Sequence, residues 1–157
     1  MTSLTTTLRD EQRLITSLIE LMKQEQQCLV SADSDALVAI TAQKSALVQQ
    51  MAACASQRHQ ALGAAGFAAA EAGMEPWLAA CSDADNAAGI LWRELLERTR
   101  TAKELNRVNG MLINKQMTHT QVVLNAMRTP AGGVDAGVYG PSGQAATSGP
   151  SRRFVVA

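Results

Sequence analysis

Apolar residues recur at helical spacing over most of the chain. Residues 3–30, about 34–62 and about 83–128 each carry an apolar stripe flanked by polar positions. Because three long amphipathic helices bury their stripes by packing together, the pattern predicts an all-α fold, an elongated antiparallel three-helix bundle or coiled coil. The first two stripes consist of Leu4, Leu8, Ile15, Leu18, Met22 and Leu29, then Leu37, Ile40, Leu47, Met51, Cys54 and Leu62.

Turn and capping residues separate the first two helices. The sequence SADSDAL (31–37) ends the first helix, and Asp33 or Ser34 offers a side-chain oxygen to the free backbone N–H groups of the second. Thr2 or Ser3 is expected to cap the first helix in the same way.

Residues 63–82 form a connector that glycines interrupt. Pro76 suits the first turn of a short helix within it. We expect Phe67 and Trp77 to close one end of the bundle rather than to bind a ligand.

The third helix is long, and the composition changes where it ends. Ser82 and Asp85 resemble a capping pair at its start, and Pro130 follows its last residues. The segment 129–157 holds six of the eleven glycines and three of the four prolines, a composition that cannot bury enough surface to fold alone. We therefore predict a helical bundle domain over residues 1–128 and a flexible tail over 129–157.

The charges balance overall but not locally. The formal net charge is zero, so there is no general electrostatic case for binding nucleic acid or an acidic membrane. Residues 1–89 hold five Lys/Arg and ten Asp/Glu, and residues 90–128 hold seven and three. We interpret this as attraction between acidic and basic helices of one bundle. Lys44 falls on the second stripe, where its aliphatic stem is expected to reach the bundle edge.

Candidate catalytic and metal-ligating groups are sparse. Cys28, Cys54 and Cys81 lie 26 and 27 residues apart, a spacing that matches no zinc or redox motif. His59 and His119 lack a surrounding HExxH or Cys/His pattern, and the carboxylates are scattered over outer helix faces with no inward pair. We expect no catalytic residue, no metal and no cofactor, and therefore a protein that is not an enzyme.

The sequence also favours a cytoplasmic protein. The N-terminus lacks the basic and apolar regions of a signal peptide. No run of about 18 apolar residues is present to cross a membrane. The cysteines are interpreted as small buried hydrophobes in a reducing compartment.

The last part of the third helix lacks the charges that a water-facing helix normally carries. Between Val108 and Met127 there is a single charged residue, Lys115. The face expected to pack on the first two helices collects Val108, Asn109, Leu112, Gln116, His119, Val123 and Ala126. The flanking positions are apolar as well, through Ile113, Met117 and Leu124 on one side and Met111 and Val122 on the other. Two helices cannot cover so much apolar surface. The uncovered part of the third helix is therefore predicted to be an interaction site.

Two alternatives remain open for this stretch. The helix is either buried in an oligomer of this chain or offers a groove to another protein's helix, and the two can coexist. Asn109-Gly110 either breaks the helix, since Asn-Gly is a turn signal, or lets a partner backbone come close.

Three short sequences resemble the flagellar export chaperones of the FlgN type. ELNRVNGMLINKQM carries an Asn106-x-x-Asn109-Gly110 core similar to that family's helix motif. SADSDALVAITAQKSAL is similar to the entry of its second helix, and VYGPSG (138–143) to its tyrosine–glycine motif near the C-terminus. The resemblance covers residues 3–143.

The resemblance implies a non-catalytic chaperone of flagellar type III secretion. Such proteins bind the C-terminal helices of hook-associated proteins, which form the hook–filament junction, prevent their premature polymerisation and deliver them to the export gate. The tail tyrosine is associated with docking to the export apparatus. The alternative is a self-associating helical assembly subunit without a client. The predicted partner-binding residues are Asn106, Asn109, Gly110, Met111, Ile113, Met117, Val122, Leu124, Met127 and Tyr139.

A substitution of Tyr139 separates the tail from the helical surface. Tyr139→Ala should leave client binding intact and weaken export, because aromatic anchors dominate small interfaces. Client capture in a pull-down and client secretion from cells measure the two effects. Loss of client capture would instead place Tyr139 in the client-binding surface.

Overall fold

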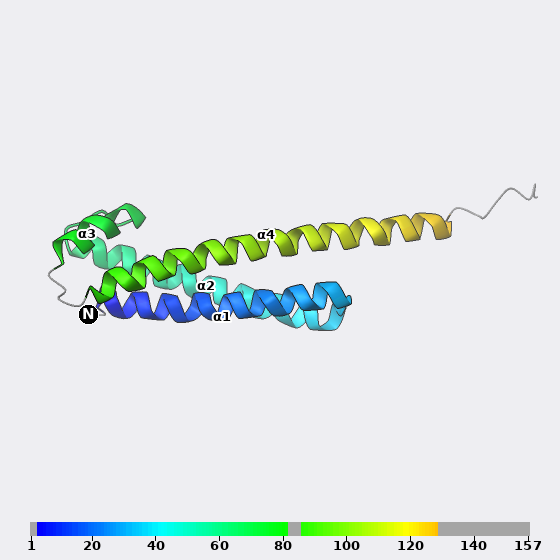
Figure 1. The fold of residues 1–157 in the computed structure, drawn as a ribbon, viewed down its shortest axis with the longest axis horizontal. Coiled ribbons are helices and arrows are strands. Elements are labelled where there is room, and N and C mark those ends of the chain that lie inside the picture. Colours follow the sequence, from blue (N-terminus) through cyan, green and yellow to red (C-terminus); the bar gives the residue numbers. More distant parts are fainter. Residues whose placement is uncertain (1–2, 82–85, 129–157) are drawn as a thin grey trace, which may run out of the picture. The chain divides into compact units, whose positions relative to one another are not determined.

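Four α-helices and one 3-10 turn make up the part of the chain that the structure, a computed structural model, describes, residues 3–81 and 86–128. The helices are α1 (Leu4–Ser31), α2 (Ser34–Ala64), α3 (Met74–Ala80) and α4 (Ala87–Arg128), with the 3-10 turn η1 (Glu71–Gly73) before α3 (Figure 1). No strand occurs within these residues, so the predicted all-α fold is confirmed. The proposed tail lies outside the described residues.

The chain divides inside α4 into two units, residues 1–117 and 118–157. The first unit contains the entire hydrophobic core. The described part of the second unit is the C-terminal end of α4, residues 118–128. Within the described residues, no helix combines the length and the hydropathy needed to cross a bilayer.

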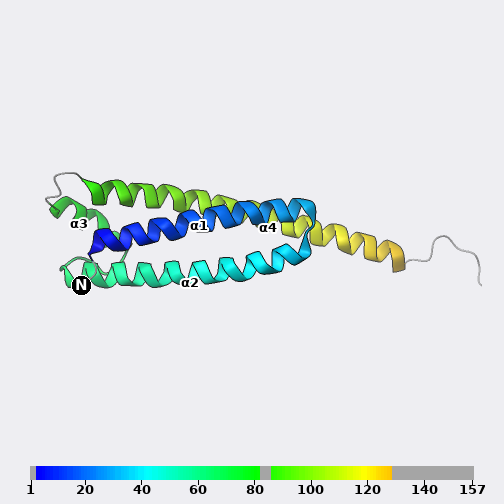
Figure 2. The ribbon, with the colours of Figure 1, turned by 90° about the horizontal axis from the view of Figure 1, so that it is seen from below.

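Helix α1 supplies the largest share of the core, and it pairs side by side with α2 in both views (Figures 1 and 2). All six residues predicted for its stripe are buried. They follow a repeat of alternating four- and three-residue steps, the spacing of a helix seam that faces partner helices. Glu11 and Glu25 occupy the two positions at which this repeat has no apolar residue, and both are buried.

These two glutamates correct the expectation that the carboxylates are scattered over outer helix faces. Glu11 accepts a 2.8 Å hydrogen bond from Nε of Arg58 on α2, and both side chains are almost completely buried. Arg58 also donates to Glu71 at 2.7 Å and lies 5.0 Å from the centroid of the Trp92 ring on α4. One cation thus joins α1, α2, η1 and α4.

Burial and Arg58 shift the pKa values of the two carboxylates in this cluster in opposite directions. Burial raises the pKa of Glu11 above its ordinary value of 4.5, although Arg58 acts in the opposite direction. At the more exposed Glu71 burial also opposes ionisation, but the hydrogen bond and charge of Arg58 lower its pKa overall. Arg58 is therefore the main group that favours the ionised form of Glu11.

The second glutamate is held by a different cation. Lys44 of α2 donates to both carboxylate oxygens of Glu25, at 3.2 and 3.0 Å. Its Nζ also donates to Oδ1 of Asn106 on α4 at 2.9 Å. Lys44 therefore does not simply extend to the bundle edge, as expected, because its ammonium group joins three helices.

The predicted helix boundaries are confirmed at the α1–α2 turn and corrected elsewhere. The Asp33 side chain accepts from the Ala36 N–H at 3.1 Å, as expected of an N-cap. Ser3 occupies the N-cap position of α1, but its side chain makes no capping bond. Helix α4 begins at Ala87 rather than near residue 83, because Asn86 adopts φ 49°, outside the right-handed helical region. Ser82 and Asp85 lie outside the described residues.

The connector closes one end of the core, as predicted. Phe67 and Trp77 are partly buried against the core, and Met74 at the start of α3 is fully buried. Pro76 falls in the first turn of α3, where its missing N–H leaves no helical bond unmade. A Cβ on Gly73 would lie 2.0 Å from the carbonyl oxygen of Ala68, so only glycine permits this close passage of the chain.

The Glu11–Arg58 pair provides a test of the bundle's stability. Arg58→Met should lower the free energy of unfolding by about 3–5 kcal/mol, because it leaves Glu11 buried without its cation. The loss should shrink as the pH falls from 7 toward 4.5, since a group with a raised pKa stabilises the fold when protonated and loses that contribution as the pH rises. Urea denaturation followed by circular dichroism measures both effects.

The double variant is the control. Glu11→Leu with Arg58→Met removes both charges and should recover most of the lost stability, because buried ion pairs contribute little net stability over apolar side chains. A double variant as unstable as Arg58→Met alone would contradict this account.

Candidate partner-binding surface

The part of α4 within the first unit exposes three of the predicted apolar contact residues. Met111 and Met117 are mostly exposed, the latter by 66%, and Ile113 is exposed by 39%. The predicted inward face is half-buried or buried up to Gln116, whose amide donates to the Leu29 carbonyl of α1. One side of this stretch therefore belongs to the bundle, and its other sides leave apolar side chains exposed.

The second unit consists, in its described part, of helical residues that are all exposed. Val122, Leu124 and Met127 are the predicted contact residues here, and Met127 is exposed by 78%. Val123 is exposed as well, together with His119 and Ala126. These last three residues correct the expectation of an inward face, which holds only as far as Gln116.

Asn109 is placed inside the bundle. It is 1% exposed, and its Nδ2 donates to the Met22 carbonyl and to Oε2 of Glu25, both at 2.8 Å. Asn106 is exposed and accepts from Lys44. The two asparagines of the Asn106-x-x-Asn109 motif thus hold α4 against α1 and α2 through the Glu25–Lys44 pair. Their role as contacts for a partner stays a prediction.

Gly110 lies in an uninterrupted helix, so the alternative of a break at Asn109-Gly110 is wrong. A Cβ at this position would have nothing within 4 Å, and no positive φ requires glycine there. The described chain thus gives no packing reason for the loss of about 1 kcal/mol that glycine causes in a helix. Close approach of a partner backbone remains the predicted reason.

The remaining candidate groups form no reactive site in the described part of the chain. The thiols of Cys28, Cys54 and Cys81 are free, and burial, with the nearby acidic charges acting in the same direction, raises the pKa of Cys54. No cluster of three or more His, Cys, Asp or Glu side chains is arranged there to hold a metal. Tyr139 lies outside the described residues.

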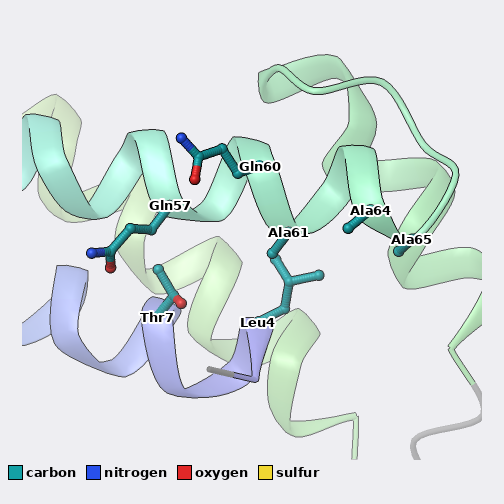
Figure 3. A pocket seen from close by; sticks show the side chains of 7 residues that line it. All are labelled: Leu4, Thr7, Gln57, Gln60, Ala61, Ala64 and Ala65. Carbon is teal, nitrogen blue, oxygen red and sulfur yellow. The ribbon is translucent and has the colours of Figure 1, made fainter. Parts of the chain in front are cut away.

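A separate concavity of about 620 Å³ lies between the start of α1 and the end of α2 (Figure 3). Leu4 and three alanines form its apolar part, and Thr7, Gln57 and Gln60 supply polar atoms. No charged side chain is found among the described residues that line it, so they offer few features that would select a ligand.

A known protein family matches most of this chain. The model of the FlgN protein family matches residues 1–147 of the 157. The chain belongs to the FlgN family. This is a family of flagellar export chaperones, as the resemblance indicated. No curated protein and no solved structure matches the chain.

Membership in the FlgN family agrees with what the described surface offers. The match covers all of the described helices, including the exposed apolar end of α4. A chaperone of polymerising proteins acts by covering apolar surface, and exposed methionines suit that role because they are flexible and polarizable. That this end of α4 binds another polypeptide stays a prediction.

Substitution of Gly110 tests whether this position serves a partner. Gly110→Ala should raise the free energy of unfolding by about 0.5–1 kcal/mol, because the added methyl meets open space and alanine favours the helix. It should also weaken capture of a client helix by occupying the space that a partner backbone needs. Urea denaturation and a binding titration measure the two effects, and unchanged capture would remove Gly110 from the predicted contact residues.

Proposed function

We propose that this chain is a cytoplasmic export chaperone for flagellar hook-associated proteins. It binds their C-terminal helices, prevents premature polymerisation and delivers them to the flagellar type III export gate. The observation that carries the proposal is the exposure of apolar side chains in both units, Met111, Ile113 and Met117 in the first and Val122, Leu124 and Met127 in the second.

The chemistry of this surface favours a helical client. The backbone groups of α4 are already bonded within the helix, so the surface offers side-chain packing and no edge for strand addition. A client that assembles through amphipathic helices brings an apolar stripe that must be covered before assembly. Since Lys115 is the one charged residue between 108 and 127, desolvating this surface costs little.

The tail completes the proposal. Residues 129–157 contain the chain's sole tyrosine, Tyr139, and we assign to this segment the docking to the export apparatus. Client binding and docking are thereby separated along the chain, so each can be altered without the other. The alternative is a self-associating assembly subunit, in which the same α4 surface is covered by copies of this chain.

A pull-down tests the proposal by comparing whole with truncated clients and the unchanged chain with its variants. The chain should capture hook-associated junction proteins and should fail to capture the same proteins without their C-terminal helices. Ile113→Asp with Leu124→Asp should abolish capture, because two charges enter an apolar interface, and should preserve helicity, because both side chains are exposed.

The matched control is Val30→Asp with Val38→Asp, which adds the same charges at exposed apolar positions near the α1–α2 turn. This control should capture the client normally. Equal recovery of whole and truncated clients would refute the proposal. Sedimentation that shows a stable oligomer, dispersed by the α4 substitutions, together with no client capture, would establish the alternative.

A further inference from the structure

A groove runs between α2 and α4 in the first unit, away from the exposed end of α4. It consists of two adjoining recesses of about 390 and 470 Å³, which share Met51, Thr99 and Lys103 in their linings. Ile15, Leu18 and Met22 of α1 form part of its floor, and α2 and α4 form its walls. Figure 2 shows α2 and α4 on either side of α1.

The walls of this groove carry exposed apolar side chains among polar ones. Val48 on α2 and Leu96 on α4 are exposed, and Met51 is only half-buried. Helix α2 as a whole buries few of its 31 residues, namely Ile40, Arg58 and Leu62. The predicted stripe of α2 is therefore wider than the surface that α1 covers, and part of it faces the groove.

Two contacts between α2 and α4 mark the ends of the groove. Lys44 donates to Asn106 at one end, and Arg58 lies over the Trp92 ring at the other. The α2 residues of these contacts are fourteen positions apart, which corresponds to about 21 Å along a helix. The open stretch thus has the length of about four helical turns.

The charges along the groove are uneven. The two carboxylates that line it, Glu11 and Glu71, are both paired with Arg58. Lys103 is exposed, lines both recesses and has no ion pair or hydrogen bond within the described part of the chain. The groove therefore presents one unpaired positive charge beside an apolar floor.

We propose that this groove binds a single amphipathic α-helix of another protein, about four turns long, with an acidic residue opposite Lys103. The occupant is a helix because the walls are helices, whose bonded backbones offer no partner to an extended chain. It would pack between α2 and α4 as the fourth helix of a bundle and cover the exposed Val48 and Leu96. This surface is distinct from the client surface of α4 and does not depend on it.

Sequence argues against the two occupants that this chain itself could supply. Residues 129–157 contain no run longer than seven residues without glycine or proline, too short for a four-turn helix. The apolar stretch 108–127 of a second copy carries Lys115 as its single charge, which repels Lys103 rather than pairing with it.

The test uses the full chain and two synthetic 16-residue helical peptides. Both carry leucine and alanine on one face, and they differ only in having glutamate or lysine along its flank. The glutamate peptide should bind more tightly, and Lys103→Glu should reverse the preference, each by about tenfold. Fluorescence anisotropy of labelled peptides measures the affinities, and equal binding of the two peptides would overturn the proposal.

Two double variants locate the bound peptide. Val48→Asp with Leu96→Asp should abolish binding, whereas Ile113→Asp with Leu124→Asp should leave it unchanged. All four side chains are exposed, and circular dichroism verifies the fold. The reverse pattern would place the peptide on the α4 end and overturn the proposal, without affecting the client pull-down that tests the proposed function.

Two further measurements identify a rival occupant. A dimer of the full chain that dissociates in the Val48→Asp/Leu96→Asp variant would show that a second copy fills the groove. Tighter peptide binding by Phe154→Asp would show that the chain's own C-terminal residues compete for it. Either result would overturn the proposal, and a monomer with unchanged affinity in Phe154→Asp would support it.

Discussion

The bundle depends on two buried carboxylates in the seam of α1. Glu11 and Glu25 lie two heptads apart, and their cations on α2, Arg58 and Lys44, are separated by the same fourteen residues. Sliding α2 along α1 by one helical turn would leave both carboxylates buried without a cation, which costs far more than the pairing gains. The two pairs therefore fix the antiparallel register, and each cation also reaches α4, through Trp92 or Asn106.

This arrangement explains why apolar surface remains open. Helix α1 buries more of its residues than α2 or α4 does, and much of the apolar stripe of α2 stays only partly covered. A fourth helix would ordinarily cover such remaining apolar sides. Near its C-terminal end α4 shows the same property, because every described residue after Gln116 is exposed.

Different residues of the FlgN-type motif have different physical roles. The buried Asn109 donates hydrogen bonds to Met22 and Glu25. Asn106 accepts a hydrogen bond from Lys44. The described fold does not require glycine at position 110, and Met111 is exposed. The motif therefore joins a structural anchor to the start of the exposed apolar stretch of α4. Helical periodicity already placed Asn109 on the inward face, but it could not show which atoms its amide would meet.

Sequence by itself determined the elements of this protein. Periodicity placed the helices, Asp33 located the turn between α1 and α2, and the loss of charge after Val108 marked the exposed end of α4. The repeat of α1 also indicated that Glu11 and Glu25 are buried, because both occupy seam positions. It could not predict which cations pair with them. Only the tertiary structure decided that Arg58 and Lys44 meet them, that Asn109 bonds to Met22 and Glu25, and that a groove stays open between α2 and α4. These features join residues tens of positions apart, and their energies exist only once the helices are packed.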